Sequence, residues 1–457
     1  MLANDKLPRL TKFLYGAGDL GFSLTETTLG VLFAIFLTDV VGLQPGLAAV
    51  AVFLGRSWDY INDPIIGHIS DRTRSRWGRR RPFLLFGFLP FMVAFSMLWW
   101  KPPFDSSIAL AVYYGLAYLC FDTAATFVYM PYFCLTPELT EDYDERTTLT
   151  SYRMAFSIVG SLIAFTVPLA IIGAMRPENS GRVFQVGVGL GVLSALPLLL
   201  TFAGTRERPE HISLEQPRLR QSLAAAAKNR PFIFASGIFL FTWTAVEIVQ
   251  GMLLYFLKYY MHLEEQSDLI AGVIFITALL TLPFWEKAAR IWDKRITYIA
   301  GMVFLSGVLI TLTFISPSLG LPLVITLAAL AGIGVSAIHV LPWAIIPDAI
   351  EWDELVTGQR HEGVFYSLVT LFRKISSSVA IPLSLLVLEW SGYVSNADQQ
   401  APSATRAIQA LIGPIPSLLL LAGIIFAVVY PLGREKHRQV RLQLASRQAA
   451  QKSDPPG

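Results

Sequence analysis

The sequence has few charged residues and almost no cysteine. Only 15% of its 457 residues are charged, 54% are hydrophobic, and the mean hydropathy is +0.53. A chain this long and this apolar is typical of polytopic membrane proteins and not of soluble globular ones. The two cysteines, Cys120 and Cys134, lie in one apolar segment. On a helix they would be roughly 21 Å apart, which is too far for a disulfide.

Patterns typical of enzymes and of nucleic-acid-binding proteins are also missing. The apolar segments contain no HExxH sequence, no Cys/His cluster and no nucleophile with a matching base, so we expect neither an enzyme, nor a transition-metal site, nor a cofactor. The net charge is only +3, and the basic residues are not interleaved with aromatic ones, so no nucleic-acid partner is predicted. The first dozen residues lack the apolar core of a cleavable signal peptide, so the first helix is expected to direct insertion.

Twelve apolar runs along the chain are each long enough to cross a bilayer. Runs of this length without alternating polarity predict an all-α polytopic membrane protein. The predicted spans are residues 13–41, 45–70, 82–100, 107–138, 147–175, 183–204, 231–260, 267–287, 296–316, 320–347, 362–392 and 407–433.

One polar, basic connection at 205–230 divides the chain into two parts. Six predicted helices lie in residues 1–204 and six in residues 231–433. The segment GHISDRTRSRWGRRR follows the second helix, and WEKAARIWDKR follows the eighth, which is the equivalent place in the second half. Two like halves are typical of a transporter that works by alternating access. Residues 434–457 are predicted to form a basic tail that anchors to anionic membrane lipid.

Lysine and arginine are concentrated in alternate connections. They occupy the N-terminus, the second, sixth and eighth connections and the tail, whereas the connections in between contain almost none. Basic residues are retained on the cytoplasmic side of a membrane. We therefore predict a multi-pass protein of the cell (inner) membrane with both termini in the cytoplasm.

The second predicted span contains two aspartates and an asparagine, in WDYINDP (58–64). Asp59, Asn62 and Asp63 follow each other at helical spacing and so share one face. Two carboxylates within a turn repel unless a proton or cation lies between them. Carboxylate and amide oxygens suit a small hard cation such as Na⁺, and Pro64 is predicted to break the helix and free a further carbonyl. The alternative is a structural ion pair with a nearby arginine or the basic loop.

Other polar side chains inside the spans form a candidate substrate site between the two halves. Ionisable residues at membrane depth are functional candidates by default. Arg153 and Lys374 each need a carboxylate partner or a polar substrate, and Glu26 and Glu247 are acids on other helices. The candidate substrate residues are Asp19, Ser23, Glu26, Tyr129, Phe133, Arg153, Glu247, Gln250, His339, Thr370 and Lys374.

A run of charges follows the second predicted helix, where GHISDR precedes a basic cluster. Such a run is ordinarily a solvated face. At this place in the chain it resembles the gating sequence of major facilitator transporters, whose charges latch the cytoplasmic side closed. We therefore predict gating roles for Asp71, Arg72, Arg79 and Arg80.

Six segments together resemble the glycoside–pentoside–hexuronide:cation symporters, the melibiose-permease group of the major facilitator superfamily. They are TDVVGL (38–43), GRSWDYINDPIIGHI (55–69), RSRWGRRRP (74–82), DERTTLTSYRM (144–154), LPWAIIPDAIEWDEL (341–355) and EGVFYSLVTLFRK (362–374). The resemblance implies a twelve-helix major facilitator fold, cation-coupled symport and a chain that is active as a monomer. The family's cation site falls on Asp59, Asn62, Asp63 and Thr126, with Na⁺, H⁺ or Li⁺ as the coupling ion.

The sugar side of that family's site is less well matched. Its helix-five arginine and helix-eleven lysine are present, but two sugar-binding aspartates fall on Ser23 and Tyr129, and two tryptophans on Phe133 and His339. For Tyr129, Phe133 and His339, packing or a structural hydrogen bond is the alternative role. A sugar, glycoside or uronate is the main prediction for the solute. YMPYFCLT, TSYRM and LPWAIIPD also resemble sodium-dependent lysophosphatidylcholine symporters, so a lysolipid or other amphipathic solute is the alternative, and lipid scrambling is a third hypothesis.

Overall fold

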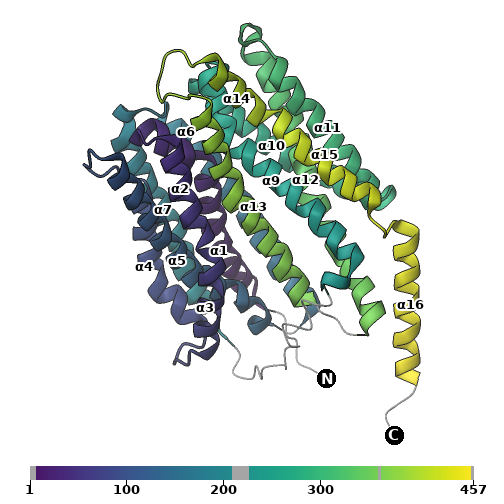
Figure 1. Cartoon of the computed structure of the whole chain (residues 1–457). Coiled ribbons are helices and arrows are strands. Elements are labelled where there is room, and N and C mark those ends of the chain that lie inside the picture. The colour runs from purple at the N-terminus through teal and green to yellow at the C-terminus, as the bar shows by residue number, and fades with distance from the viewer. Residues whose placement is uncertain (1–6, 141, 208–225, 359–361, 454–457) are drawn as a thin grey trace. The chain divides into compact units, whose positions relative to one another are not determined.

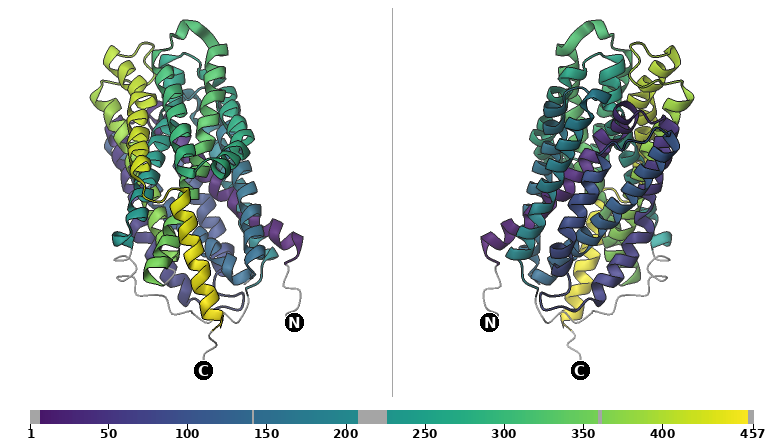
Figure 2. Two further views of the ribbon diagram at one scale, coloured as in Figure 1. Left: turned by 90° about the vertical axis from the view of Figure 1, so that its right-hand side faces the viewer. Right: turned by 90° about the vertical axis from the view of Figure 1, so that its left-hand side faces the viewer.

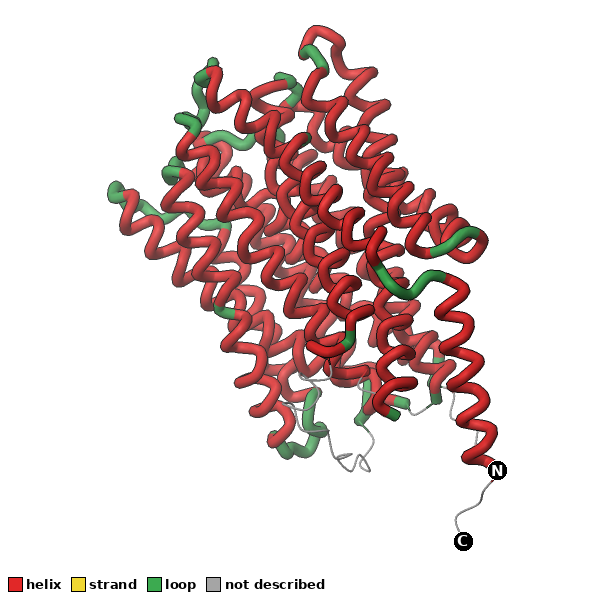
Figure 3. The backbone as a smooth tube through the Cα atoms, turned by 45° about the vertical axis from the view of Figure 1, so that its right-hand side comes forward, coloured by secondary structure: helices red, strands yellow, loops and turns green. Residues whose placement is uncertain are grey.

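The computed structural model describes residues 7–140, 142–207, 226–358 and 362–453, and over these ranges the chain consists of helices joined by loops (Figure 3). Its contacts group the chain into two compact units. Unit 1 comprises Met1–Ile212, Gln250–Gly272 and Ile381–Ile408. Unit 2 comprises Ser213–Val249, Val273–Ala380 and Gln409–Gly457. Three long helices and one short one therefore contribute residues to both units.

Most of unit 1 is formed by the N-terminal elements. They are α1 (Arg9–Thr28), which continues through the π-helical segments η1 (Leu29–Phe33) and η2 (Phe36–Val41), then α2 (Pro45–Ser57), α3 (Asp59–Arg72), α4 (Arg81–Leu98), α5 (Ser107–Leu139), α6 (Tyr143–Ile172), η3 (Pro177–Asn179) and α7 (Ser180–Gly204). Helix α1 packs along α6 and α7, α4 packs along α5 and α7, and both α2 and α3 lie against α5 (Figure 1; Figure 2).

Small residues bring α1 close to its neighbours. A β-carbon added at Gly21 would overlap the Ser194 carbonyl oxygen of α7, and one added at Gly160 of α6 would overlap the Leu20 carbonyl oxygen of α1. In a bilayer, helices associate by close packing because lipid is as apolar as their side chains. The two glycines therefore fix the position of α1, which carries several of the predicted substrate residues.

The remaining elements supply unit 2 and complete unit 1. They are α9 (Arg230–Tyr255), its π-helical continuation η4 (Phe256–Tyr260), η5 (Glu264–Gln266), α10 (Ser267–Ile291), α11 (Lys294–Phe314), η6 (Pro317–Leu319), α12 (Gly320–Thr357), α13 (Glu362–Trp390), α14 (Pro402–Ile412), α15 (Pro414–Val429) and α16 (Arg434–Ser453). Within unit 2, α11 packs along α12 and α15, and the tail helix α16 lies against α12.

Every predicted span is helical in the structure. Among the described residues, 10 elements are long and apolar enough to cross a membrane. The predicted spans 13–41 and 45–70 are not among these elements, although both are helical. The first contains Asp19, Glu26 and Asp39, and the second contains Asp59 and Asp63. The second is also divided into α2 and α3, of 13 and 14 residues, each shorter than a helix that crosses a bilayer.

Two predicted spans are interrupted. Residues 45–70 form α2 and α3, which meet at Trp58, and Pro64 lies inside α3. The predicted break at Asp63 and Pro64 is therefore wrong: α3 continues through Pro64, because a proline can kink a helix without ending it. Residues 407–433 form α14 and α15, which are separated by Gly413. A β-carbon at Gly413 would overlap the Thr313 hydroxyl of α11, so this break allows a close approach of two helices.

The predicted division into halves at 1–204 and 231–433 stays a prediction. Most of the predicted linker, residues 208–225, and the last tail residues, 454–457, lie outside the described part of the chain.

Candidate functional site

Three of the four predicted cation-site residues meet where α3 lies against α5. The Thr126 hydroxyl oxygen is 3.3 Å from Asp59 Oδ1 and 3.4 Å from Asp63 Oδ1. A hydroxyl carries one proton, so Thr126 donates to one carboxylate at a time. The fourth residue, Asn62, is buried, and its Nδ2 donates to the carbonyl of Asp122 at 3.3 Å. The structure thus places two acids around one hydroxyl, with the amide beside them.

The helix break at Trp58 positions the two acids differently along α3. Asp59 lies in the first turn of α3, where the positive end of the helix dipole stabilises a carboxylate. Asp63 is one turn further along, on the same face. Thr126 is buried on α5 and closes this face. Carboxylate and hydroxyl oxygens are ligands for a hard cation, and a bound cation would remove the repulsion between the two acids.

A second cluster lies where α1, α5 and α6 meet. The Arg153 Nε atom is 3.4 Å from Asp19 Oδ2, and the Asp19 carboxylate is buried. The Arg153 guanidinium also stacks over the Phe133 ring, with its central carbon 4.7 Å from the ring centroid. Glu26, one of the two acids named above as available to Arg153 and Lys374, is exposed on α1. The acid that the α1–α6 contact brings to Arg153 is Asp19.

Aromatic rings line one side of this cluster. Phe22 of α1 meets Tyr129 and Phe133 of α5 edge-on, with centroid distances of 5.0 and 5.2 Å. The Tyr129 hydroxyl is buried against Gly21 and makes no hydrogen bond within the described part of the chain. The next polar residue on α1, Ser23, forms a hydroxyl–hydroxyl hydrogen bond with Ser157 of α6. Sequence reasoning missed Phe22, because a phenylalanine in an apolar helix resembles any lipid-facing residue.

Two of the predicted substrate residues on unit 2 make local contacts. The His339 Nδ1 atom donates to the Val335 carbonyl oxygen, one turn earlier on α12, at 3.0 Å. Its ring also packs edge-on against Trp243, at a centroid distance of 5.4 Å. The Thr370 hydroxyl on α13 donates to the Tyr366 carbonyl at 3.0 Å. Each of these bonds satisfies a polar group within its own helix.

Three further predicted residues lie on α9 and α13. Glu247 and Lys374 are half-buried and belong to unit 2. Gln250 belongs to unit 1, where its side-chain amide lies over Gly30 of η1. A common substrate site for these residues and the Asp19–Arg153 pair stays a prediction.

The predicted gating residues form a charged cluster at the ends of α3 and α4. Arg79 Nη2 is 2.7 Å from Glu138 Oε1, and Arg80 pairs with both Glu138, at 3.1 Å, and Asp71. Burial alone would lower the pKa of the Arg80 guanidinium, but nearby Cys134, Asp71 and Glu138 raise it above its ordinary value. Arg80 therefore remains a cation in this environment. The other predicted member, Arg72, is exposed.

Two acids in this cluster were not predicted from the sequence. Glu138 lies at the end of α5, and Glu207 follows α7. The Glu207 carboxylate accepts the backbone N–H groups of Arg79, Arg80 and Arg81, at 2.5, 2.8 and 2.8 Å. These donors would otherwise be unsatisfied at the start of α4. Acids near the ends of two other helices were the available sequence signal, since the basic run needs counter-charges.

We expect Glu138→Gln to destabilise this cluster. The buried Glu138 carboxylate is shared by Arg79 and Arg80, and a charge-assisted hydrogen bond contributes about 1.5–3 kcal/mol. The apparent melting temperature of purified protein should therefore fall by several degrees, measured by thermal denaturation. Arg72→Gln, at an exposed position in the same charged run, is the control and should melt like the wild type. An unchanged melting temperature for Glu138→Gln would show that the cluster is not a structural unit.

Comparisons with known proteins agree on the kind of molecule. A family model described as MFS/sugar transport protein matches residues 14–434. An uncharacterized symporter of Synechocystis sp. is 34% identical, over 98% of this chain and 98% of its own. The sodium-dependent lysophosphatidylcholine symporter 1-A of Danio rerio is 27% identical, over 95% of this chain and 88% of its own.

The fold has a solved counterpart in the nucleoside transporter NupG. Its crystal structure matches with a TM-score of 0.65 at 13% identity, over 93% of this chain and 100% of that chain. At this identity the likeness concerns the fold alone. Because the family model covers most of the chain, this multi-pass, all-helical membrane protein belongs to the MFS/sugar transport protein family and is a major facilitator transporter of the symporter type, not an enzyme.

Proposed function

We propose that this transporter is driven by Na⁺, which binds at Asp59, Asn62, Asp63 and Thr126. The observation that carries the proposal is the approach of both carboxylates to one hydroxyl in the contact between α3 and α5. Two carboxylates this close to one hydroxyl attract a cation more strongly than either would alone. The printed description of the Danio rerio relative as sodium-dependent supports Na⁺ over H⁺ or Li⁺.

Coupling follows if cation and solute favour the same conformation. Each ligand then tightens the binding of the other by the same factor. The half-loaded carrier is held back, while the empty or fully loaded carrier changes its accessible side. In this proposal the cation site couples solute movement to the Na⁺ gradient, and the residues on α1, α5 and α6 select the solute.

The first candidate solute is a sugar, glycoside or uronate. The Asp19–Arg153 pair offers both an acceptor and several donors for hydroxyl or carboxylate groups. The Phe133 ring, which lies under the Arg153 guanidinium, offers an apolar face for the less polar side of a sugar ring. The description of the matched family as sugar transport proteins agrees with this class.

The second candidate solute is a lysolipid or another amphipathic molecule. The edge-on rings of Phe22, Tyr129 and Phe133 suit an apolar chain better than a polyol. Unit 2 also has a groove of about 420 Å³ along α9 and α13, lined by residues such as Phe232, Leu368 and Phe372. The similarity to a lysophosphatidylcholine symporter supports this class. Lipid scrambling, the remaining hypothesis, requires no cation.

Thermal stabilisation of the purified protein separates these candidates. Sugars, glycosides, uronates and lysophosphatidylcholine are tested singly, in NaCl and in choline chloride of equal ionic strength. A ligand at about 100 times its Kd stabilises the folded state by about 2.7 kcal/mol. We expect one class to raise the melting temperature, and to do so more strongly in NaCl. Equal stabilisation in the two salts would contradict Na⁺ coupling.

Placement in the membrane completes the proposal. We propose a monomer in the cell (inner) membrane with both termini in the cytoplasm, because basic residues are concentrated in the connections on the side of the termini. The exposed basic residues of α16 would then face anionic lipid.

A further inference from the structure

The first predicted helix of each half ends in the same way. IFLTDVVGL (35–43) and YFLKYYMHL (255–263) align along their length, and each contains a π-helical segment, η2 or η4. In each, the residue before the last leucine is left-handed: Gly42 has a φ of 87° and His262 a φ of 54°. In each, the last leucine donates its N–H to the carbonyl of the earlier leucine, at 2.9 and 2.8 Å. The two ends are therefore copies of one structural element.

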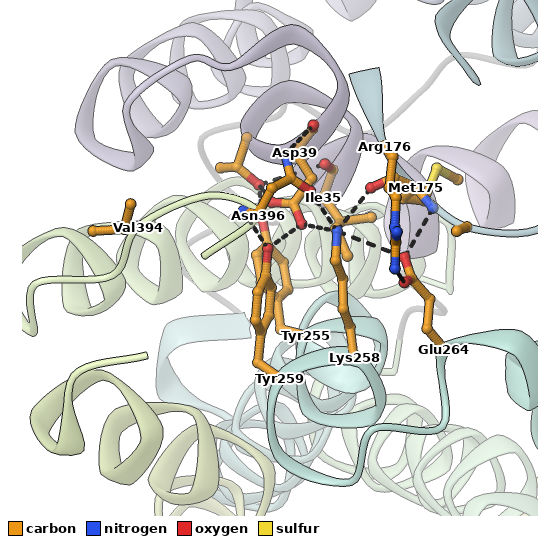
Figure 4. Close-up of polar contacts among 12 residues, drawn as sticks. Ile35, Asp39, Met175, Arg176, Tyr255, Lys258, Tyr259, Glu264, Val394 and Asn396 are labelled. Carbon is orange, nitrogen blue, oxygen red and sulfur yellow. Dashed lines mark hydrogen bonds and ion pairs between the residues drawn. The ribbon is translucent and has the colours of Figure 1, made fainter. Parts of the chain in front are cut away.

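The two copies are joined through opposite charges. Lys258 Nζ of η4 is 2.6 Å from Asp39 Oδ2 of η2, and Asp39 is fully buried (Figure 4). The hydroxyls of Tyr259 and Tyr393 donate to the two oxygens of the same carboxylate, both at 2.5 Å. The Asn396 side-chain amide donates to the backbone carbonyl of Asp39 at 2.8 Å. The first half thus supplies the acid, and the second half supplies the base and most of the hydrogen bonds.

The lysine is as completely bonded as the aspartate. Besides Asp39, its ammonium group donates to the carbonyl of Met175 and to Asn396 Oδ1, each at 2.8 Å. Glu264 lies 3.6 Å away and also accepts the backbone N–H of Met175, at 3.0 Å. An ammonium has three donors, so Lys258 has none to spare. These contacts join the end of α9 to the connections that follow α6 and α13.

Such a cluster is stable only when it is complete. A buried ion pair loses much of its Coulomb energy to desolvation, and removing one partner strands the other charge. Opening the cluster would expose both charges to water. It would also break the contacts of Asp39 with Lys258, Tyr259, Tyr393 and Asn396 together. Alternating access requires this kind of reversible contact, since one end of the two halves must separate in each cycle.

We propose that Asp39 and Lys258, with Tyr259, Tyr393 and Asn396, are a latch that holds this end of the transporter shut. The cluster is flanked by the connections 173–179, 262–266 and 391–401, which contain few basic residues, and it is thus on the opposite side from the Arg79–Arg80 cluster. The latch closes the route from that side and breaks when the solute enters there.

The test measures the opening directly and needs neither Na⁺ nor solute, so it stands apart from the proposed coupling. Cys120 and Cys134 are replaced by serine, and spin labels are attached at Asp105→Cys and Asp398→Cys, both exposed positions in unit 1. Pulsed electron–electron double resonance of the protein in nanodiscs gives the distribution of distances between the two spin labels. Asp39→Asn and Lys258→Met should each increase the ratio of the longer to the shorter distance at least tenfold, because the first removes the nearer of the two acids beside Lys258 and the second leaves the fully buried Asp39 carboxylate without its cation.

Three further variants make the result specific. Asp39→Asn with Lys258→Met removes both charges and should return the distribution toward the wild type. Tyr393→Phe removes the hydroxyl that contacts both Asp39 and the Tyr259 hydroxyl without stranding a charge, and should give a smaller shift in the same direction. Glu265→Gln, at the exposed acid next to the cluster, should leave the distribution unchanged. The latch is excluded if the single charge variants keep the wild-type distribution, or if the double variant opens by the sum of the two single effects.

Discussion

Replacing either Asp59 or Asp63 by asparagine is expected to weaken Na⁺ binding by about a hundredfold. Each carboxylate lies beside the Thr126 hydroxyl, so each contributes an oxygen and half of the negative charge that attracts a cation. A charged contact of this kind is worth about 1.5–3 kcal/mol, and 1.4 kcal/mol corresponds to a factor of ten. Asparagine keeps the shape and one oxygen but removes the charge.

The measurement is Na⁺-stimulated binding or uptake of the solute that the thermal screen identifies, in vesicles with Na⁺ varied against choline. Both variants should lose the stimulation while they still insert and bind solute weakly. Asp105→Asn removes an exposed acid from a loop and should leave the Na⁺ dependence at the wild-type level. Full Na⁺ dependence in both Asp59→Asn and Asp63→Asn would refute the cation site.

Replacing Asp19 by asparagine is expected to be the most destabilising change in the solute cluster. It leaves the Arg153 guanidinium between α1, α5 and α6 without the carboxylate that lies 3.4 Å from it. Breaking a buried ion pair in this way costs about 3–5 kcal/mol. The apparent melting temperature should therefore fall, and transport should be lost at temperatures at which the wild type is active.

A second substitution distinguishes an unpaired charge from a lost ligand. Asp19→Asn with Arg153→Gln removes both charges and should recover much of the melting temperature, without recovering transport. Ser23→Ala removes only the neutral hydrogen bond to Ser157 one turn away and should have a smaller effect. If Asp19→Asn is as stable as the wild type, Arg153 does not depend on this carboxylate.

The cation site was the most predictable part of the candidate sites. Asp59, Asn62 and Asp63 belong to one helix, and helical spacing alone puts them on one face. Thr126 lies on another helix, so its place beside them came from a family resemblance, and the contact between α3 and α5 agrees with it. The helix break was misplaced because the spacing of residues does not show where a proline-containing helix relaxes.

The solute cluster and the charged ends were less predictable because they depend on helix packing. Asp19 was a candidate, but its pairing with Arg153 follows from the close approach of α1 to α6, which glycines permit. Glu138 and Glu207 were missed because each is far along the chain from the arginines it contacts. In the same way Asp39, although it lies in a quoted motif, acquires its partner only from η4.

By itself, the sequence determined that this protein is a helical membrane transporter with charged groups at membrane depth. Hydropathy, helical spacing and the placement of basic residues are local properties, and they can be read from the sequence without knowledge of the fold. Only the tertiary structure decided which buried charge neutralises which, because opposite charges on different helices pair according to how closely those helices pack. Asp19 with Arg153, Glu138 with Arg80, and Asp39 with Lys258 are the pairs that this packing selected.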